Sequence, residues 1–148
     1  MRRKVSALLF HHVGPRRPQT YASLTIEPVR FERFMRLLAR TGHSGVSAAD
    51  WLSWRRGENS LPRRAVILTF DDAYEDLVEF ALPTLVRFEF RATAFVVASE
   101  VGRRNSWDAS AGAGGHTLMS ATDVRTWLDA GREAMSAGRA GMFPFAAS

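Results

Sequence analysis

The chain has 148 residues, of which 46% are hydrophobic, and a formal net charge of +5. This length and hydrophobic content suit one ordinary domain with its own core. The absence of cysteine excludes disulfides, thiolate catalysis and zinc–thiolate sites. No apolar run approaches the about 18 residues that a membrane-spanning helix needs, so we expect no membrane span.

The basic residues are almost all arginine, and many of them stand in doublets that are scattered along the chain. These doublets are Arg2-Arg3, Arg16-Arg17, Arg55-Arg56, Arg63-Arg64 and Arg103-Arg104. A nucleic-acid-binding surface would gather such residues on one element, with aromatic residues between them. We therefore expect a solvated surface and no nucleic-acid partner.

The first ten residues, MRRKVSALLF, have the basic and then apolar order of a secretory signal. However, the apolar run is short, ends at His11 and His12, and lacks a small-residue cleavage site. We interpret Val5–Phe10 as a first strand, and we expect no targeting signal and, by default, a cytoplasmic location.

The next elements have helical spacing and clear ends. Apolar residues from Phe31 to Leu38 recur at helical intervals, with Pro28 in the first turn and Gly42 just past the end. The stretch Ser47-Ala-Ala-Asp50 has the form of a capping box and predicts a short helix that Gly57 closes.

The central part of the chain alternates strand and helix. Ala65–Phe70 predicts a buried strand, Glu75–Phe88 is helical in pattern with a new piece starting near Pro83, and Thr93–Ala98 predicts another strand. This alternation indicates an α/β architecture with a parallel sheet.

The last part begins with a loop of Ala, Gly and Ser at residues 109–115. A second capping box at Ser120–Asp123 predicts a helix that carries Trp127 and stops near Gly131. Residues 132–148 show no convincing period, and we assign them no element.

Two adjacent carboxylates, Asp71 and Asp72, directly follow the most apolar strand. Ligand sites in parallel α/β sheets lie beyond the carboxyl ends of the strands. Asp72 alone is explained equally well as a helix cap. Two neighbouring carboxylates repel unless a cation or hydrogen-bond donors intervene, and a divalent metal held by one carboxylate, with the other acting as base, resolves this conflict.

The stretch LTFDDAYEDL around these carboxylates resembles the first motif of the polysaccharide deacetylase family (carbohydrate esterase family 4), whose pattern is Thr-Phe-Asp-Asp-Gly. LFHHVGP at 9–15, ALPTLVRFEFRATAFVV at 81–97 and LMSATDVRTWLDAG at 118–131 are also similar to stretches of that family. The resemblance extends to about residue 133. It implies an incomplete (β/α) barrel-like fold that is truncated at its carboxyl end, with residues 1–131 as the N-terminal part of the domain and 132–148 as an aberrant or disordered tail.

The resemblance also implies a reaction, a metal and a partner. The reaction is metal-dependent removal of acetyl groups from an N-acetylated polysaccharide or oligosaccharide. By motif position, Asp71 would be the general base and Asp72 a ligand of a divalent metal, which is zinc by family.

Two departures from the family pattern bear on that activity. The glycine of the motif is Ala73, which is strained if the position requires φ > 0. The two metal-binding histidines of the next motif fall on Ala137 and Gly141, whose side chains cannot bind a metal. We therefore expect doubtful metal binding and an inactive or impaired enzyme.

The remaining histidines and aromatic residues offer other roles. A lone loop histidine, His116, is more often solvent-exposed than a ligand, whereas His11 at the end of the first strand is a candidate for the substrate groove. Tyr74 and Trp107 are candidates for sugar stacking in that groove. They leave open the alternative of a carbohydrate-binding pseudo-enzyme without catalysis.

Overall fold

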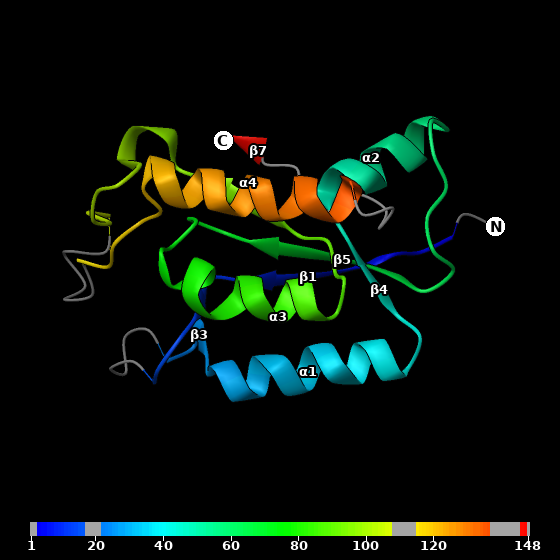
Figure 1. The fold of residues 1–148 in the computed structure, drawn as a ribbon, viewed down its shortest axis with the longest axis horizontal. Coiled ribbons are helices and arrows are strands. Elements are labelled where there is room, and N and C mark those ends of the chain that lie inside the picture. Colours follow the sequence, from blue (N-terminus) through cyan, green and yellow to red (C-terminus); the bar gives the residue numbers. More distant parts are fainter. Residues whose placement is uncertain (1–2, 17–21, 108–114, 137–145, 148) are drawn as a thin grey trace.

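The computed structural model describes residues 3–16, 22–107, 115–136 and 146–147 of the chain (Figure 1). Helices and parallel strands alternate along the sequence. This arrangement confirms the predicted α/β class. Among the described residues, none of the helices has both the length and the hydropathy needed to cross a lipid bilayer.

The sheet is built around one central strand, β5 (Ala65–Phe70). Strand β1 (Ser6–Phe10) pairs with β5 on one side in parallel, from Ser6 opposite Val66 to Phe10 opposite Phe70. On the other side, β4 (Ser44–Val46) pairs with the start of β5, and β6 (Thr93–Val96) pairs with its end. The carboxyl end of β1 therefore lies beside the carboxyl end of β5.

Three further strands are only two residues long. Strands β2 (His12–Val13) and β3 (Thr25–Ile26) form a small parallel sheet of their own. Strand β7 (Ala146–Ala147) pairs in parallel with β6. The sequence analysis assigned no element to β2, β3, β4 or β7, because runs of two or three residues carry no readable hydrophobic period.

The helices confirm several of the predicted ends. Asp50 and Ser47 form the predicted capping box at the start of the second helix, and Gly57 closes this helix in the left-handed conformation. Ser120 and Asp123 make the equivalent reciprocal contacts at the start of the last helix. The helical segments are α1 (Pro28–Arg40), α2 (Ala48–Arg56), a π-helix (Leu77–Ala81), α3 (Leu82–Arg87), a short 3₁₀ turn (Ala98–Glu100) and α4 (Ala121–Ser136).

The last helix corrects one prediction. Helix α4 does not stop near Gly131 but continues to Ser136. A glycine inside a helix costs only about 1 kcal/mol, and the Arg, Glu, Ala and Met that follow it are good helix formers. Part of the segment 132–148 is therefore helical, residues 146–147 pair with β6, and residues 137–145 and 148 lie outside the described residues.

Alternate side chains of β5 face two separate apolar clusters. Val66, Leu68 and Phe70 pack into the larger cluster with side chains from α1, α3 and α4, including the buried Trp127. Ala65 and Ile67 face a smaller cluster that the side chains of α2 help to cover. Because both faces of β5 are buried, its sequence is apolar throughout, as is typical of a central parallel strand.

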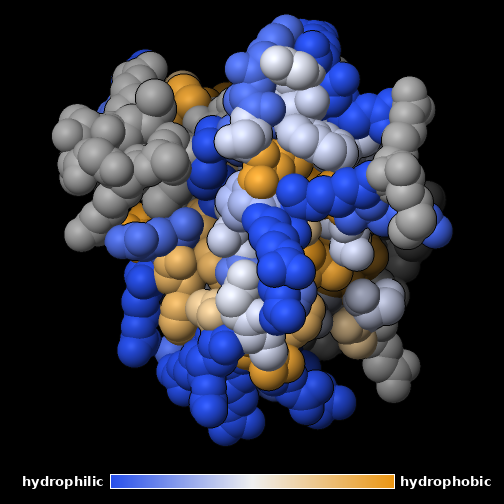
Figure 2. Space-filling model, turned by 90° about the vertical axis from the view of Figure 1, so that its right-hand side faces the viewer, coloured by the Kyte–Doolittle hydropathy of each residue, from blue (hydrophilic) through white to orange (hydrophobic). Residues whose placement is uncertain are grey.

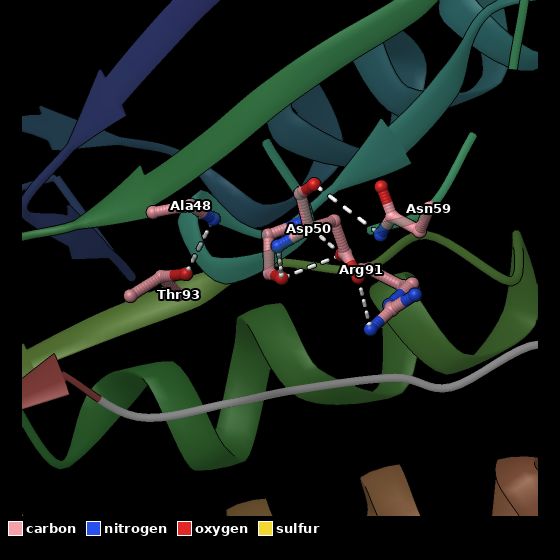
Figure 3. A network of polar contacts seen from close by, with 6 residues as sticks. Ala48, Asp50, Asn59, Arg91 and Thr93 are labelled. Atoms are coloured by element: carbon pink, nitrogen blue, oxygen red, sulfur yellow. Dashed lines mark hydrogen bonds and ion pairs between the residues drawn. The ribbon is translucent and has the colours of Figure 1, made fainter. Parts of the chain in front are cut away.

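A polar network fixes α2 to the segment that leads into β6 (Figure 3). The Asp50 carboxylate accepts the capping contacts of Ser47 and forms an ion pair with Arg91 at 2.6 Å. The Thr93 hydroxyl accepts a hydrogen bond from the Ala48 N–H. Burial lowers the pKa of Arg91, and the neighbouring Asp50 carboxylate opposes that shift.

The turn after β5 is unusual, because two consecutive residues that are not glycine have positive φ. Asp72 has φ +65° and Ala73 has φ +46°. The left-handed conformation costs an alanine about 1–2 kcal/mol because its Cβ approaches the following carbonyl. Ala73 is nevertheless buried in the larger cluster, so the burial of its methyl group offsets part of the free-energy cost of the strain.

Replacing Asp50 by asparagine should lower the free energy of unfolding by about 3 kcal/mol. Breaking a buried ion pair costs about 3–5 kcal/mol, and Arg91 remains one-quarter exposed, which favours the lower end. Urea denaturation measures the loss. Glu58→Gln is the matched control, because it removes an exposed pair with Arg56 at 4.0 Å and should cost less than about 0.5 kcal/mol. Equal losses in the two variants would contradict a structural role for the Asp50 network.

Replacing Ala73 by glycine should leave the stability almost unchanged. A buried alanine-to-glycine change normally costs about 1.5 kcal/mol through the lost methyl group and the more flexible unfolded chain. At Ala73 the relief of left-handed strain should cancel that loss to within about 0.5 kcal/mol. Ala94→Gly in β6 is the control, because Ala94 is equally buried and has no positive φ. If both variants lose the same stability in urea denaturation, Ala73 is not strained.

Candidate active site

The carboxyl ends of β1 and β5 bring His11 and Asp71 together. The Asp71 N–H donates a hydrogen bond to the Phe10 carbonyl at 2.9 Å, which ties the end of β5 to the end of β1. The His11 Nε2 atom then lies 4.0 Å from the Asp71 Oδ2 atom. The Asp71 side chain is 38% exposed and that of His11 is 23% exposed. This pair is therefore accessible to solvent and to a small substrate group.

Asp72 follows in the left-handed turn. Its positive φ redirects the backbone immediately after Asp71, so that the chain leaves the sheet for the π-helix Leu77–Ala81. The side chain is half-buried. The sharing of one cation by Asp71 and Asp72 stays a prediction.

His12, the neighbour of His11, points into the protein. It is fully buried, and its Nδ1 atom lies 2.8 Å from the Asp76 Oδ2 atom. The Tyr74 ring stacks on the His12 imidazole with centroids 3.7 Å apart. These contacts hold β2 against the segment that follows Asp71. His12 and Asp76 therefore help to fix the position of the candidate site.

The loop that carries His116 packs against the stacked rings of His12 and Tyr74. The His116 ring lies 5.1 Å from that of His12, and its backbone N–H donates to the Asn105 Oδ1 atom at 2.8 Å. The Asn105 side chain also donates to the Tyr74 hydroxyl at 3.4 Å. His116 is therefore half-buried beside His12. It does not have the solvent-exposed setting expected of a loop histidine.

A shallow pocket of about 420 Å³ lies beside this cluster. Glu75, Asp76, Glu79 and His116 contribute to its lining. Its acidic wall comes from the segment that follows Asp72 in the chain. Asp71 is not among the lining residues, so the pocket flanks the candidate catalytic carboxylate.

The two aromatic groove candidates occupy different environments. Tyr74 is only 2% exposed, and His12 covers a face of its ring, so Tyr74 is a core residue here and offers no platform to a sugar. Trp107 is 41% exposed and stays a candidate.

The donor set of the described residues does not fit a metal. Zinc in a catalytic site takes about three protein ligands and a water. Within residues 3–16, 22–107, 115–136 and 146–147, no three or more His, Asp or Glu side chains converge into a group that could hold an ion. Asp71 with His11, and Asp76 with His12, form two separate pairs. Ala137 and Gly141 lie outside the described residues.

The sequence analysis missed Asp76 and the supporting role of His12. Two features of the sequence pointed to these residues. Asp72 and Asp76 stand four residues apart where a helix begins, and His11 and His12 follow the predicted first strand. Which histidine turns inward depends on the twist of the chain between β1 and β2, and no period in two residues shows it.

Comparisons with known proteins identify the family of the chain. Residues 58–136, slightly more than half of the chain and including Asp71 and Asp72, match the family model for polysaccharide deacetylase. A putative polysaccharide deacetylase of Bacillus subtilis is 24% identical over 102 residues, which are 69% of this chain and 35% of that protein. The poly-β-1,6-N-acetyl-D-glucosamine N-deacetylase of Escherichia coli is 38% identical over 64 residues, which are 43% of this chain and 10% of the enzyme.

Solved structures show the same fold. A de-N-acetylase from Aggregatibacter actinomycetemcomitans superposes with a TM-score of 0.70 at 21% identity, covering 97% of this chain and 53% of that one. IcaB from Ammonifex degensii gives a TM-score of 0.65 at 21% identity, with coverages of 97% and 51%. The likeness confirms the predicted deacetylase-like α/β fold, and this chain spans about half the length of these structures. Since the family model matches more than half of the chain, the protein belongs to the polysaccharide deacetylase family.

Proposed function

We propose that the carboxylates of this chain form part of a site that hydrolyses the acetyl amide of an N-acetylated polysaccharide. We also propose that the 148 residues by themselves catalyse this hydrolysis poorly. The observation that carries the proposal is the exposed Asp71 carboxylate beside His11 at the end of the central strand, in a member of the deacetylase family. The substrate class follows from a relative, the poly-β-1,6-N-acetyl-D-glucosamine N-deacetylase of Escherichia coli.

Asp71 is the proposed general base. An exposed carboxylate at this position takes a proton from water while the water oxygen bonds to the acetyl carbonyl carbon. Asp71 then returns this proton to the amide nitrogen as the C–N bond breaks, which yields acetate and the free amine of the sugar. His11, 4.0 Å from Asp71, is near enough to contact the same acetyl group.

The poor activity that we propose follows from the small number of side chains that could bind a metal ion. Asp72 is the proposed metal ligand, with zinc the expected ion. Zinc hydrolases use the ion to polarise the carbonyl. The described residues offer no group of three donors, and Ala137 and Gly141 carry no donor atoms in their side chains. One carboxylate without such partners binds the ion weakly.

Carbohydrate binding without catalysis is the second candidate. Its support is the exposed Trp107, because aromatic faces stack on sugar rings. Its weakness is Tyr74, whose ring is buried against His12.

Purified chain should contain much less than one zinc per molecule and release little or no acetate from acetylated chito-oligosaccharides. Elemental analysis and an acetate assay with added zinc measure both. Any residual activity should fall at least about tenfold in Asp71→Asn, because the general base is lost. Glu58→Gln, which removes an exposed carboxylate elsewhere, should leave that activity unchanged. Stoichiometric zinc with steady turnover would show that the impairment is wrong.

Binding of the same oligosaccharides separates the two candidates. If the chain binds sugar without hydrolysis, Trp107→Ala should weaken binding in calorimetry by about 1–2 kcal/mol, because a stacking face is lost. Trp127→Ala is unsuitable as a control because Trp127 is fully buried. Arg55→Gln, an exposed change on α2, should have no effect. Sugar binding that is unaffected by Trp107→Ala would contradict the stacking role.

A further inference from the structure

The outward face of α1 has an unusual composition. Its exposed residues are four arginines and two aliphatic residues: Val29, Arg30, Arg33, Arg36, Leu37 and Arg40. The opposite face buries Phe31 and Met35 in the core. A solvated helix face normally mixes both signs of charge and carries few large apolar residues. Here the exposed side chains of α1 include no acid.

The two aliphatic residues are strongly exposed. Val29 is 60% exposed and Leu37 is 56% exposed, although each stands on a helix whose inner face is fully packed. They lie two turns apart, with Arg33 between them on the same face. Single exposed aliphatic residues are common, but these two share one face with every exposed arginine of α1.

Positive charge is concentrated around this face. Glu27 pairs with Arg30, and Glu32 pairs with Arg36 and Arg87. Within the described part of the chain, no ion pair involves Arg33 or Arg40.

Arg64 adds a sixth arginine to the end of the helix, where it donates to the Thr41 carbonyl. These six arginines and the two glutamates that pair with them together carry a net charge of +4. The four arginines of α1 are single residues in the sequence, and the turns of the helix bring them onto one face.

The face is also accessible. Helix α1 runs along the lower edge of the molecule in Figure 1. In Figure 2, hydrophilic residues gather along the same lower edge, with hydrophobic residues between them. A shallow hollow of about 480 Å³ is lined by Arg33, Arg36, Leu37, Arg40 and Thr41, so three arginines and one aliphatic residue of α1 border the same space.

We propose that the outward face of α1 docks on the surface of an anionic phospholipid bilayer. Arginines attract anionic headgroups, and the aliphatic side chains enter the boundary between headgroups and acyl chains. A nucleic acid would use the charge but would give Val29 and Leu37 no role, because its backbone presents only phosphate and sugar. The mixture of arginine and aliphatic residues is the reason for choosing lipid.

Vesicle co-sedimentation of the whole chain tests the proposal. The chain should bind phosphatidylcholine vesicles that contain about 30% phosphatidylglycerol, and not pure phosphatidylcholine. Raising the salt from about 0.1 M to about 0.5 M should weaken binding, because the Debye length shortens. Failure to bind the anionic vesicles would overturn the proposal.

Matched variants locate the binding surface. Arg33→Gln with Arg40→Gln should lower partitioning about thirtyfold, at about fivefold for each charge near the surface. Arg55→Gln with Arg56→Gln removes the same charge from α2 and should change partitioning less than about twofold. Equal losses would show that only net charge matters and would overturn the assignment to α1.

The aliphatic residues distinguish lipid from a polyanion. Leu37→Ser should weaken binding to anionic vesicles and leave retention on duplex DNA unchanged, whereas Leu52→Ser, an exposed change on α2, should affect neither. If Leu37→Ser has no effect on vesicles and the chain binds DNA more tightly, the face is a nucleic-acid surface and the proposal is wrong. Circular dichroism melting of each variant verifies that the fold is intact.

Discussion

The burial of β5 on both faces is the constraint on which the rest of this structure depends. One face of β5, which carries Val66, Leu68 and Phe70, is buried under α1, α3 and α4. The other face, which carries Ala65 and Ile67, is buried in a smaller cluster with side chains of α2. Because β1 pairs with β5 from Val66 to Phe70, the end of β1 is fixed in register with the end of β5. The candidate site inherits its position from that register, since His11 and Asp71 are the first residues past it.

The turn that follows β5 combines conformational strain with tight anchoring. Asp72 and Ala73 both adopt positive φ, which is costly for residues with a Cβ. The surrounding contacts compensate for that cost: Tyr74 is buried against His12, and Asp76 forms a hydrogen bond with the same histidine. Strain persists only where neighbouring contacts over-determine it, and here the contacts come from β2 and the His116 loop. The direction in which the chain presents Asp71 therefore depends on residues that take no part in the proposed chemistry.

The protein combines a family architecture with an incomplete donor set in the described part of the chain. The fold and the Asp71–Asp72 motif belong to the polysaccharide deacetylase family, yet the described residues contain no group of three or more His, Asp or Glu side chains that could hold a metal ion. Charge is distributed just as unevenly. Glu75, Asp76 and Glu79 line the pocket beside the candidate site, while four exposed arginines lie on α1. Separate surfaces of opposite sign allow one to face a substrate and the other an anionic partner.

The sequence by itself determined the elements whose signals are local. The strand Ala65–Phe70, the helix from Pro28, the capping boxes at Ser47 and Ser120 and the motif at Asp71 all follow from periodicity, caps and short-range pattern, and the structure contains them. The tertiary structure alone decided which of His11 and His12 turns outward and that Tyr74 is a core residue. Those outcomes depend on contacts between residues far apart in the chain, such as His12 with Asp76. Local propensity carries no information about such contacts.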